Sequence, residues 1–295
     1  MTTFVQHVID ALSVGSTYAL LALSLTLVFS VMNLINFAFG MMLVWAGYVA
    51  IVLLDAGISF WVMVPLCIAF SILLSMVIGR VAFRPFIGAP PITLLITSFG
   101  VLLVIQYAAI LVFGEGPRIL QLPTFFSEVI EVGDIRVPVL EIITIATAVV
   151  VVAVFYGLLN RTAFGAQIRA AAEQPQITRL MGVKPDRVLM IVFAISGAIT
   201  GVAALLWFAK SGAITPRSDL EPTIKAFIAL VLGGLGSTRG ALIGGLTLGA
   251  VEVAMSATLP TDALGYQPAI VFTAVIVILL VRPAGLSGTG METPR

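Results

Sequence analysis

Long apolar runs alternate with short polar links along this chain. Because about 20 mainly apolar residues in helical form cross a bilayer, each long run predicts a transmembrane helix. The runs lie near 8–31, 34–54, 59–79, 91–113, 138–158, 188–209, 240–259 and 267–282. A further run, 222–236, is too short and predicts a half-helix or a broken span, which is stable only beside protein or a water-filled cavity. We therefore expect an all-α polytopic transmembrane bundle of about 8–9 spans, forming a single domain over 1–295.

Composition supports a membrane protein. Apolar residues make up 60% of the chain and charged residues 10%, against about 25% charged residues in a soluble domain. The net charge is +1, and no basic block suggests nucleic acid as a partner. The single cysteine, Cys67, cannot form an intramolecular disulfide.

Basic residues orient the spans. They follow the third and last spans and crowd the link between the fifth and sixth, whereas acidic residues occupy the opposite links. The positive-inside rule places the basic links in the cytoplasm. The N-terminus is then outside and the C-terminus inside if 222–236 crosses; a re-entrant segment would shift one earlier boundary. The basic residues are Arg80, Arg84, Arg161, Arg169, Arg179, Lys184, Arg187 and Arg282.

The cytoplasmic link 160–187 contains a helix-forming core, "GAQIRAAAEQ". Pro175 ends this helix and can begin a second one, which Gly182 would terminate. Ile177, Leu180 and Met181 would give the second helix an apolar face suited to a groove in a cytosolic partner. The alternative is a solvated basic connector.

Three polar residues stand out inside or beside apolar runs. Asn33 and Asn36 form either a short interfacial turn or hydrogen bonds inside the bundle. Glu252 lies well inside the span that begins near Gly240. A carboxylate at that depth is expected to face a pore or to bond to a neighbouring helix.

The sequence offers little support for catalysis. Its one histidine, His7, leaves no Ser-His-Asp set and no histidine metal cluster. The stretch "GGLGSTRG" lacks the lysine and hydroxyl residue of a phosphate-binding loop, because Arg239 is followed by glycine. A membrane enzyme using Glu252 or Glu141 would lack a nucleophile, metal or base partner. We expect no catalytic, metal or cofactor site in this chain.

The same stretch is rich in glycine. Gly233, Gly234 and Gly236 predict a bend after the short apolar run. The next helix carries a stripe of small residues that predicts close helix packing. The stripe consists of Gly240, Gly244, Gly245 and Gly249.

Four segments together resemble the permeases of branched-chain amino acid ABC importers. They occur in order over nearly the whole chain, and the third is the most specific. They are "GSTYALLALSLTLVFSVMNLINFAFG", "RAAAEQPQITRLMGVKPDRVLMIVFAISGAITGVAALL", "IKAFIALVLGGLGSTRGALIGGLTLGAVE" and "VRPAGL".

The resemblance implies a multi-pass permease subunit in a bacterial inner membrane, surrounded by membrane lipid. Its partners would be a second permease, identical or related, two cytosolic ATPases that bind ATP and magnesium, and an extracytoplasmic solute-binding protein. The link 160–187 would couple to the ATPase through Arg169, Glu173, Gln176, Arg179, Leu180, Met181 and Gly182. Candidates for the translocation path are Asn33, Asn36, Phe39 and Glu252.

Two positions depart from the family pattern. Gln176 stands six residues before Gly182, where an acidic residue is typical, and Phe39 replaces the histidine of "NFAHG" found in many relatives. Because of the departure at Phe39, the transported solute can be a branched-chain amino acid, urea, an amide or another small organic solute. An ion-coupled secondary transporter is the alternative function, since broken helices occur there too.

Overall fold

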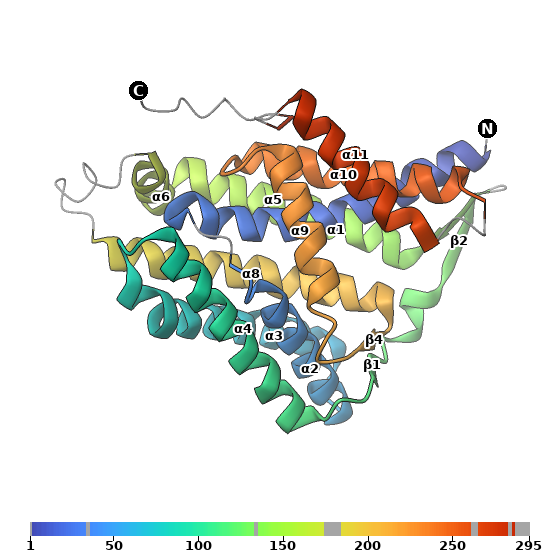
Figure 1. Ribbon diagram of the computed structural model, residues 1–295. Coiled ribbons are helices and arrows are strands. Elements are labelled where there is room, and N and C mark those ends of the chain that lie inside the picture. Colours follow the sequence, from blue (N-terminus) through green and yellow to red (C-terminus); the bar gives the residue numbers. More distant parts are fainter. Residues whose placement is uncertain are drawn as a thin grey trace. The chain divides into compact units, whose positions relative to one another are not determined.

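A computed structural model describes residues 2–33, 36–132, 135–173, 184–260, 265–282 and 285–286. Helices dominate the described chain (Figure 1), which confirms the all-α class. They are α1 Thr2–Met32, α2 Phe39–Asp55, α3 Phe60–Ile78, α4 Pro91–Phe113, α5 Val139–Arg161, α6 Ala163–Glu173, α8 Pro185–Ser211, α9 Leu220–Gly233, α10 Thr238–Thr258 and α11 Gln267–Val281. The described residues also form a π-helical turn, Gly79–Phe83, and two 3-10 turns, Arg84–Phe86 and Thr124–Ser127.

Within the described residues, six helices are long and apolar enough to cross a membrane: α1, α3, α4, α5, α8 and α10. The helices α2 and α11 are apolar but shorter. α2 begins at Phe39 and not near 34, because Asn36 lies in a turn that starts the helix. The expected start of α4 at Pro91 is confirmed.

The short apolar run forms a short helix, as expected. α9 spans 14 residues and ends at Gly233. Gly234 and Gly236 then adopt left-handed φ values of 111° and 80°, a conformation that glycine adopts without strain. The Ser237 side chain caps α10 by accepting a hydrogen bond from the Gly240 amide at 3.0 Å. The chain therefore reverses between α9 and α10 within a few residues.

Two small antiparallel sheets occur in the links, and the sequence analysis did not predict them. β1, Arg118–Ile119, pairs with β4, Ala213–Ile214. β2, Val129–Val132, forms a hairpin with β3, Ile135–Pro138. These strands are too short to show a recognisable alternation of polar and apolar residues.

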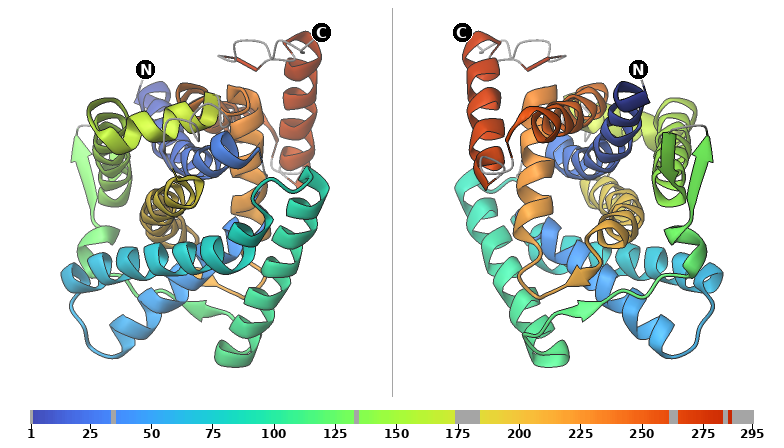
Figure 2. Two further views of the ribbon diagram at one scale, coloured as in Figure 1. Left: turned by 90° about the vertical axis from the view of Figure 1, so that its left-hand side faces the viewer. Right: turned by 90° about the vertical axis from the view of Figure 1, so that its right-hand side faces the viewer.

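The helices group into two compact units. Unit 1 contains Met1–Thr26, Pro123–Ala148 and Ile224–Arg295, and unit 2 contains Leu27–Leu122 and Val149–Thr223. Within unit 2, α3 packs against both α2 and α8 (Figure 2).

Small residues bring α3 and α8 into close contact. Gly197 and Gly201 lie one turn apart on α8 and face Ser71 and Ser75 of α3. A Cβ atom added to Gly197 would stand 2.7 Å from the Ser71 carbonyl oxygen. The Ser75 hydroxyl also donates a 2.6 Å hydrogen bond to the Phe193 carbonyl. Glycine and serine here permit the close backbone approach that stabilises helix pairs in lipid.

A large side chain at Gly197 tests this contact. Gly197→Leu is expected to destabilise the protein by about 1–3 kcal/mol, because leucine would push α8 away from α3. The measurement is the melting temperature of the detergent-solubilised protein. Gly100→Leu is the matched control, since a Cβ atom at Gly100 of α4 would have nothing within 4 Å. Equal effects of the two changes would contradict a special role for the α3–α8 contact.

Candidate functional site

An ion pair lies inside unit 1. The Lys225 ammonium of α9 stands 2.5 Å from Glu252 Oε1 of α10. The Tyr18 hydroxyl of α1 donates a 2.8 Å hydrogen bond to Glu252 Oε2. Lys225 Nζ also lies 5.3 Å from the centre of the Tyr18 ring, within cation–π range. We call these three residues the charged cluster.

The charged cluster is mostly shielded from solvent. The side chains of Lys225 and Glu252 are 13% and 20% exposed. Glu252 belongs to a helix long enough to span the membrane, and that helix has no other charged residue after Arg239. A lone charge at this depth is unfavourable by a few kcal/mol or more. Pairing and the tyrosine hydrogen bond offset much of this penalty, which explains why lysine and glutamate occur together here.

Glycines fix the helices that carry the charged cluster. A Cβ atom at Gly245 or Gly249 of α10 would collide with the backbone of α1 at Ala19 or Gly15. Both helices thus present small residues four apart, the spacing of close helix contacts in lipid. Figure 1 shows α1 and α10 running alongside one another.

The second face of α10 packs against α9 in the same manner. A Cβ atom at Gly244 would collide with the Ala229 carbonyl, and one at Gly233 would collide with Gly240. Lys225, Ala229 and Gly233 recur every four residues and so lie on one face of α9. The close contact between the α9 and α10 backbones therefore also places Lys225 next to Glu252.

Sequence reasoning identified Glu252 but missed Lys225 and Tyr18. Lys225 carried the same signal as Glu252, a charge inside an apolar run. The orientation of α9 relative to α10 was needed to pair them. Tyr18 gave no signal, because a tyrosine in an apolar helix is ordinary.

The other translocation-path candidates belong to unit 2. Asn33 is exposed and has a left-handed φ of 50°. Asn36 is buried, and its Oδ1 accepts a 3.1 Å hydrogen bond from the Ala38 amide at the start of α2. Phe39, the first residue of α2, is 1% exposed. Asn36 thus stabilises a turn through a local bond, although it is buried.

A buried carboxyl group lies just before α9 in unit 2. Asp219 is 6% exposed, and Gln106 Nε2 donates to the Pro216 carbonyl at 3.3 Å and reaches Asp219 Oδ1 at 3.5 Å. Burial raises the pKa of the Asp219 carboxyl, because the charged form loses hydration. A hydrogen bond from its own backbone amide lowers it by less. Gly40 of α2 packs directly on Asp219 and Thr223.

The expected coupling segment begins with α6, which lies between α5 and α8 as predicted for the first of two short helices. The Arg169 guanidinium donates to the Leu159 carbonyl near the end of α5. Ile168 is buried, whereas Phe164 is half exposed. Glu173 is the last residue of α6. Gln176, Arg179, Leu180, Met181 and Gly182, with the second predicted helix, lie outside the described residues.

The described residues bring no three histidine, cysteine, aspartate or glutamate side chains together as a metal site requires. The charged cluster itself offers hydrogen bonding and charge pairing. A hydroxyl, an ammonium and a carboxylate can each contact a polar molecule.

The charged cluster can be tested by neutralising one partner or both. Glu252→Gln leaves the Lys225 ammonium without its carboxylate and is expected to destabilise the protein by up to about 3–5 kcal/mol. The double change Lys225→Met with Glu252→Gln removes both charges and should recover most of this loss. Melting temperatures of the purified variants measure both effects.

The exposed pair Arg136–Glu131 gives a matched control in the same unit. Its atoms lie 3.0 Å apart, and its side chains are 77% and 61% exposed. Glu131→Gln is expected to change stability by only about 0–1 kcal/mol. A double variant of the charged cluster that is no more stable than Glu252→Gln alone would show that the two charges do not stabilise each other.

Comparison with known proteins assigns the chain to a family. The family model described as "Branched-chain amino acid transport system / permease component" matches residues 7–282. The high-affinity branched-chain amino acid transport system permease protein LivH of Salmonella typhimurium is 34% identical over 97% of this chain and 96% of its own. The corresponding protein BraD of Pseudomonas aeruginosa is 33% identical over the same shares. The fructose import permease protein FruF of Bifidobacterium longum is 28% identical over 92% of this chain and 75% of its own.

No solved structure matches the chain. The family match covers the helices of both units, including α1, α9 and α10, which carry the charged cluster. The chain is a multi-pass membrane protein that belongs to the family of branched-chain amino acid transport permease components.

Proposed function

We propose that this protein is the permease subunit of an ABC importer in a bacterial inner membrane. It forms the translocation path for branched-chain amino acids or a related small polar organic solute. The observation that carries the proposal is the similarity to LivH at 34% identity over nearly the whole chain. The more distant similarity to a fructose import permease supports leaving the solute class broad.

ATP is hydrolysed, in this proposal, on two separate cytosolic subunits that bind ATP and magnesium. A second permease subunit, identical or related, completes the path, and an extracytoplasmic binding protein delivers the solute. The present chain contributes no catalytic residue. Its "GGLGSTRG" stretch forms the bend between α9 and α10, where the backbone packs against neighbouring helices.

The link 160–187 is proposed to couple this chain to the ATPase. α6 contacts α5 through Arg169 and packs against α8. A displacement of α6 would therefore move the ends of two long apolar helices. Switching between two packed arrangements of this kind is a common basis of alternating access.

The charged cluster is proposed to line the path. A polar solute in a bilayer needs hydrogen-bonding groups, and Tyr18, Lys225 and Glu252 provide a donor, a cation and an anion together. Lys225 and Glu252 retain partial exposure, so the cluster is not sealed inside the protein.

An ion-coupled secondary transporter is the second candidate. The break between α9 and α10 and the ion pair that joins these two helices favour this function, because such carriers place binding sites at broken helices.

Uptake assays separate the two mechanisms. The permease is reconstituted into proteoliposomes with its proposed partners, the ATPase and the binding protein. Radiolabelled leucine is then offered with ATP or with an imposed proton or sodium gradient. We expect uptake that requires ATP and the ATPase, because the glycine-rich stretch of this chain lacks the lysine and hydroxyl residue of a phosphate-binding loop.

Gradient-driven uptake in vesicles without the ATPase would support the secondary transporter instead. Titration of the binding protein with candidate solutes would identify the substrate.

The coupling segment gives a separate prediction. Arg169→Glu replaces the cation that bonds the Leu159 carbonyl with an anion, so α6 should lose its attachment to α5. Gly182→Pro should disrupt the end of the second predicted helix. Both changes are expected to reduce copurification of the ATPase and ATP-driven uptake while leaving membrane insertion intact.

Arg136→Glu is the control, since this exposed arginine lies in the β2–β3 hairpin, away from the coupling segment in sequence. Normal copurification and uptake in both coupling variants would exclude a docking role for this segment.

A further inference from the structure

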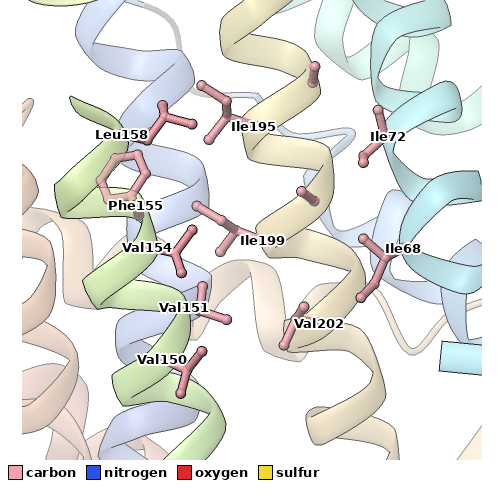
Figure 3. A pocket seen from close by; sticks show the side chains of 12 residues that line it. Ile68, Ile72, Val150, Val151, Val154, Phe155, Leu158, Ile195, Ile199 and Val202 are labelled. Atoms are coloured by element: carbon pink, nitrogen blue, oxygen red, sulfur yellow. The ribbon is translucent and has the colours of Figure 1, made fainter. Parts of the chain in front are cut away.

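A groove of about 410 Å³ lies among α3, α5 and α8 of unit 2 (Figure 3). Two isoleucines of α3, five residues of α5 and five residues of α8 line it. All of these side chains are aliphatic except Phe155. An apolar cavity does not retain water, because water there would lack polar partners. The groove is therefore suited to hydrocarbon.

The groove opens away from the protein along α5. Val150 and Val154, which line it, are 60% and 64% exposed. In Figure 3, α8 lies between α5 and α3, and the labelled side chains project between these helices. Each of the three helices is long and apolar enough to span a membrane. The open side thus faces lipid in a bilayer.

The groove runs parallel to the helix axes. Its length matches a substantial part of a lipid acyl chain. Its lining on α5 runs from Val150 to Leu158, a distance of about 12 Å at the helical rise. The lining on α8, from Ala194 to Val202, has the same length. In Figure 3, Leu158, Ile195 and Ile72 lie toward one end, and Val150 and Val202 lie toward the other.

Arginines follow beyond the end marked by Leu158. Arg161 comes three residues after Leu158 on α5, Arg187 seven residues before Ala194 on α8, and Arg80 eight residues after Ile72. At the helical rise these positions are about 5 to 12 Å beyond the groove. Arginines near the ends of membrane-spanning helices extend toward the lipid headgroups. The positive-inside rule places this end in the cytoplasmic leaflet.

These three arginines are available to a ligand. Each is exposed, and none forms an ion pair with another described residue. The neighbouring Arg84 differs, because it pairs with Asp186 at 2.5 Å. One end of the apolar groove is thus followed by three arginines that have no ion pair among the described residues: Arg161 at the end of α5, Arg187 near the start of α8 and Arg80 in the π-helical turn after α3.

We propose that this groove binds an anionic phospholipid of the cytoplasmic leaflet. One acyl chain lies against α5 and α8, and the phosphate of the headgroup contacts Arg161, Arg187 and Arg80. Basic sites between transmembrane helices on the cytoplasmic side bind anionic headgroups in this manner. A helix of a neighbouring subunit fits less well, because valine, leucine and phenylalanine line the α5 wall and close helix contacts in lipid use small residues.

Retention of lipid by the full-length protein tests the apolar part of the site. The protein is purified from membranes containing equal amounts of phosphatidylglycerol and phosphatidylcholine, and bound lipid is counted by native mass spectrometry. The wild-type protein should retain phosphatidylglycerol preferentially. Val154→Trp fills the groove and should lower this retention severalfold. Val104→Trp on α4, at a residue 71% exposed and outside the groove, should leave it unchanged.

The headgroup contact has its own test. Arg161→Gln should lower the preference for phosphatidylglycerol over phosphatidylcholine by about fivefold, as expected for one basic residue near a membrane surface. Arg136→Gln, an exposed arginine of the β2–β3 hairpin, is the matched control and should have no effect.

A photoreactive amino acid at position 154 shows whether a lipid or a protein occupies the groove. This experiment does not depend on the stability of the tryptophan variants. An adduct with phosphatidylglycerol supports the proposal. An adduct with a second protein chain, or equal retention of the two lipids by the wild-type protein, would overturn it. Equal losses in Val154→Trp and Val104→Trp would also overturn it.

Discussion

Close approach of helix backbones is the constraint on which the rest of this structure depends. Lipid is as apolar as leucine, so apolar surface alone gives membrane helices little reason to associate. In this protein small residues four apart face small residues four apart at three helix contacts. The contacts are α3 with α8 in unit 2, and α10 with α1 and with α9 in unit 1. Once the helix backbones are in contact, the positions of the other side chains on these helices are fixed relative to one another.

The charged cluster follows from these contacts. Lys225 lies on the α9 face that contains Ala229 and Gly233, and Glu252 lies beyond the α10 glycines. Larger residues at the glycine positions would separate the helices by several ångströms and part the ammonium from the carboxylate. Two unfavourable charges can then remain at membrane depth only because the glycines bring them together. The glycine contacts of unit 1 therefore determine both how its helices pack and whether its two buried charges can pair.

Much of the fold could be predicted from the sequence, because hydrocarbon imposes a simple rule on length and polarity. The runs near 91–113 and 138–158 became α4 and α5, and the short run at 222–236 became α9 and its bend. The start of α2 was misplaced by the turn at Asn36, and the small sheets were missed because two to four residues carry no usable periodicity. Glu252 could be identified alone. Its partners Lys225 and Tyr18 required the register between three helices, which no local pattern contains.

The two faces of α10 have a mechanical consequence. Gly244 and Gly245 are adjacent in sequence, yet about 100° apart around the helix, and they touch different helices. α10 cannot withdraw from one neighbour without altering its fit to the other, since both contacts involve backbone with no flexible side chain to absorb the change. A displacement of α9 is therefore transmitted to α1 through α10.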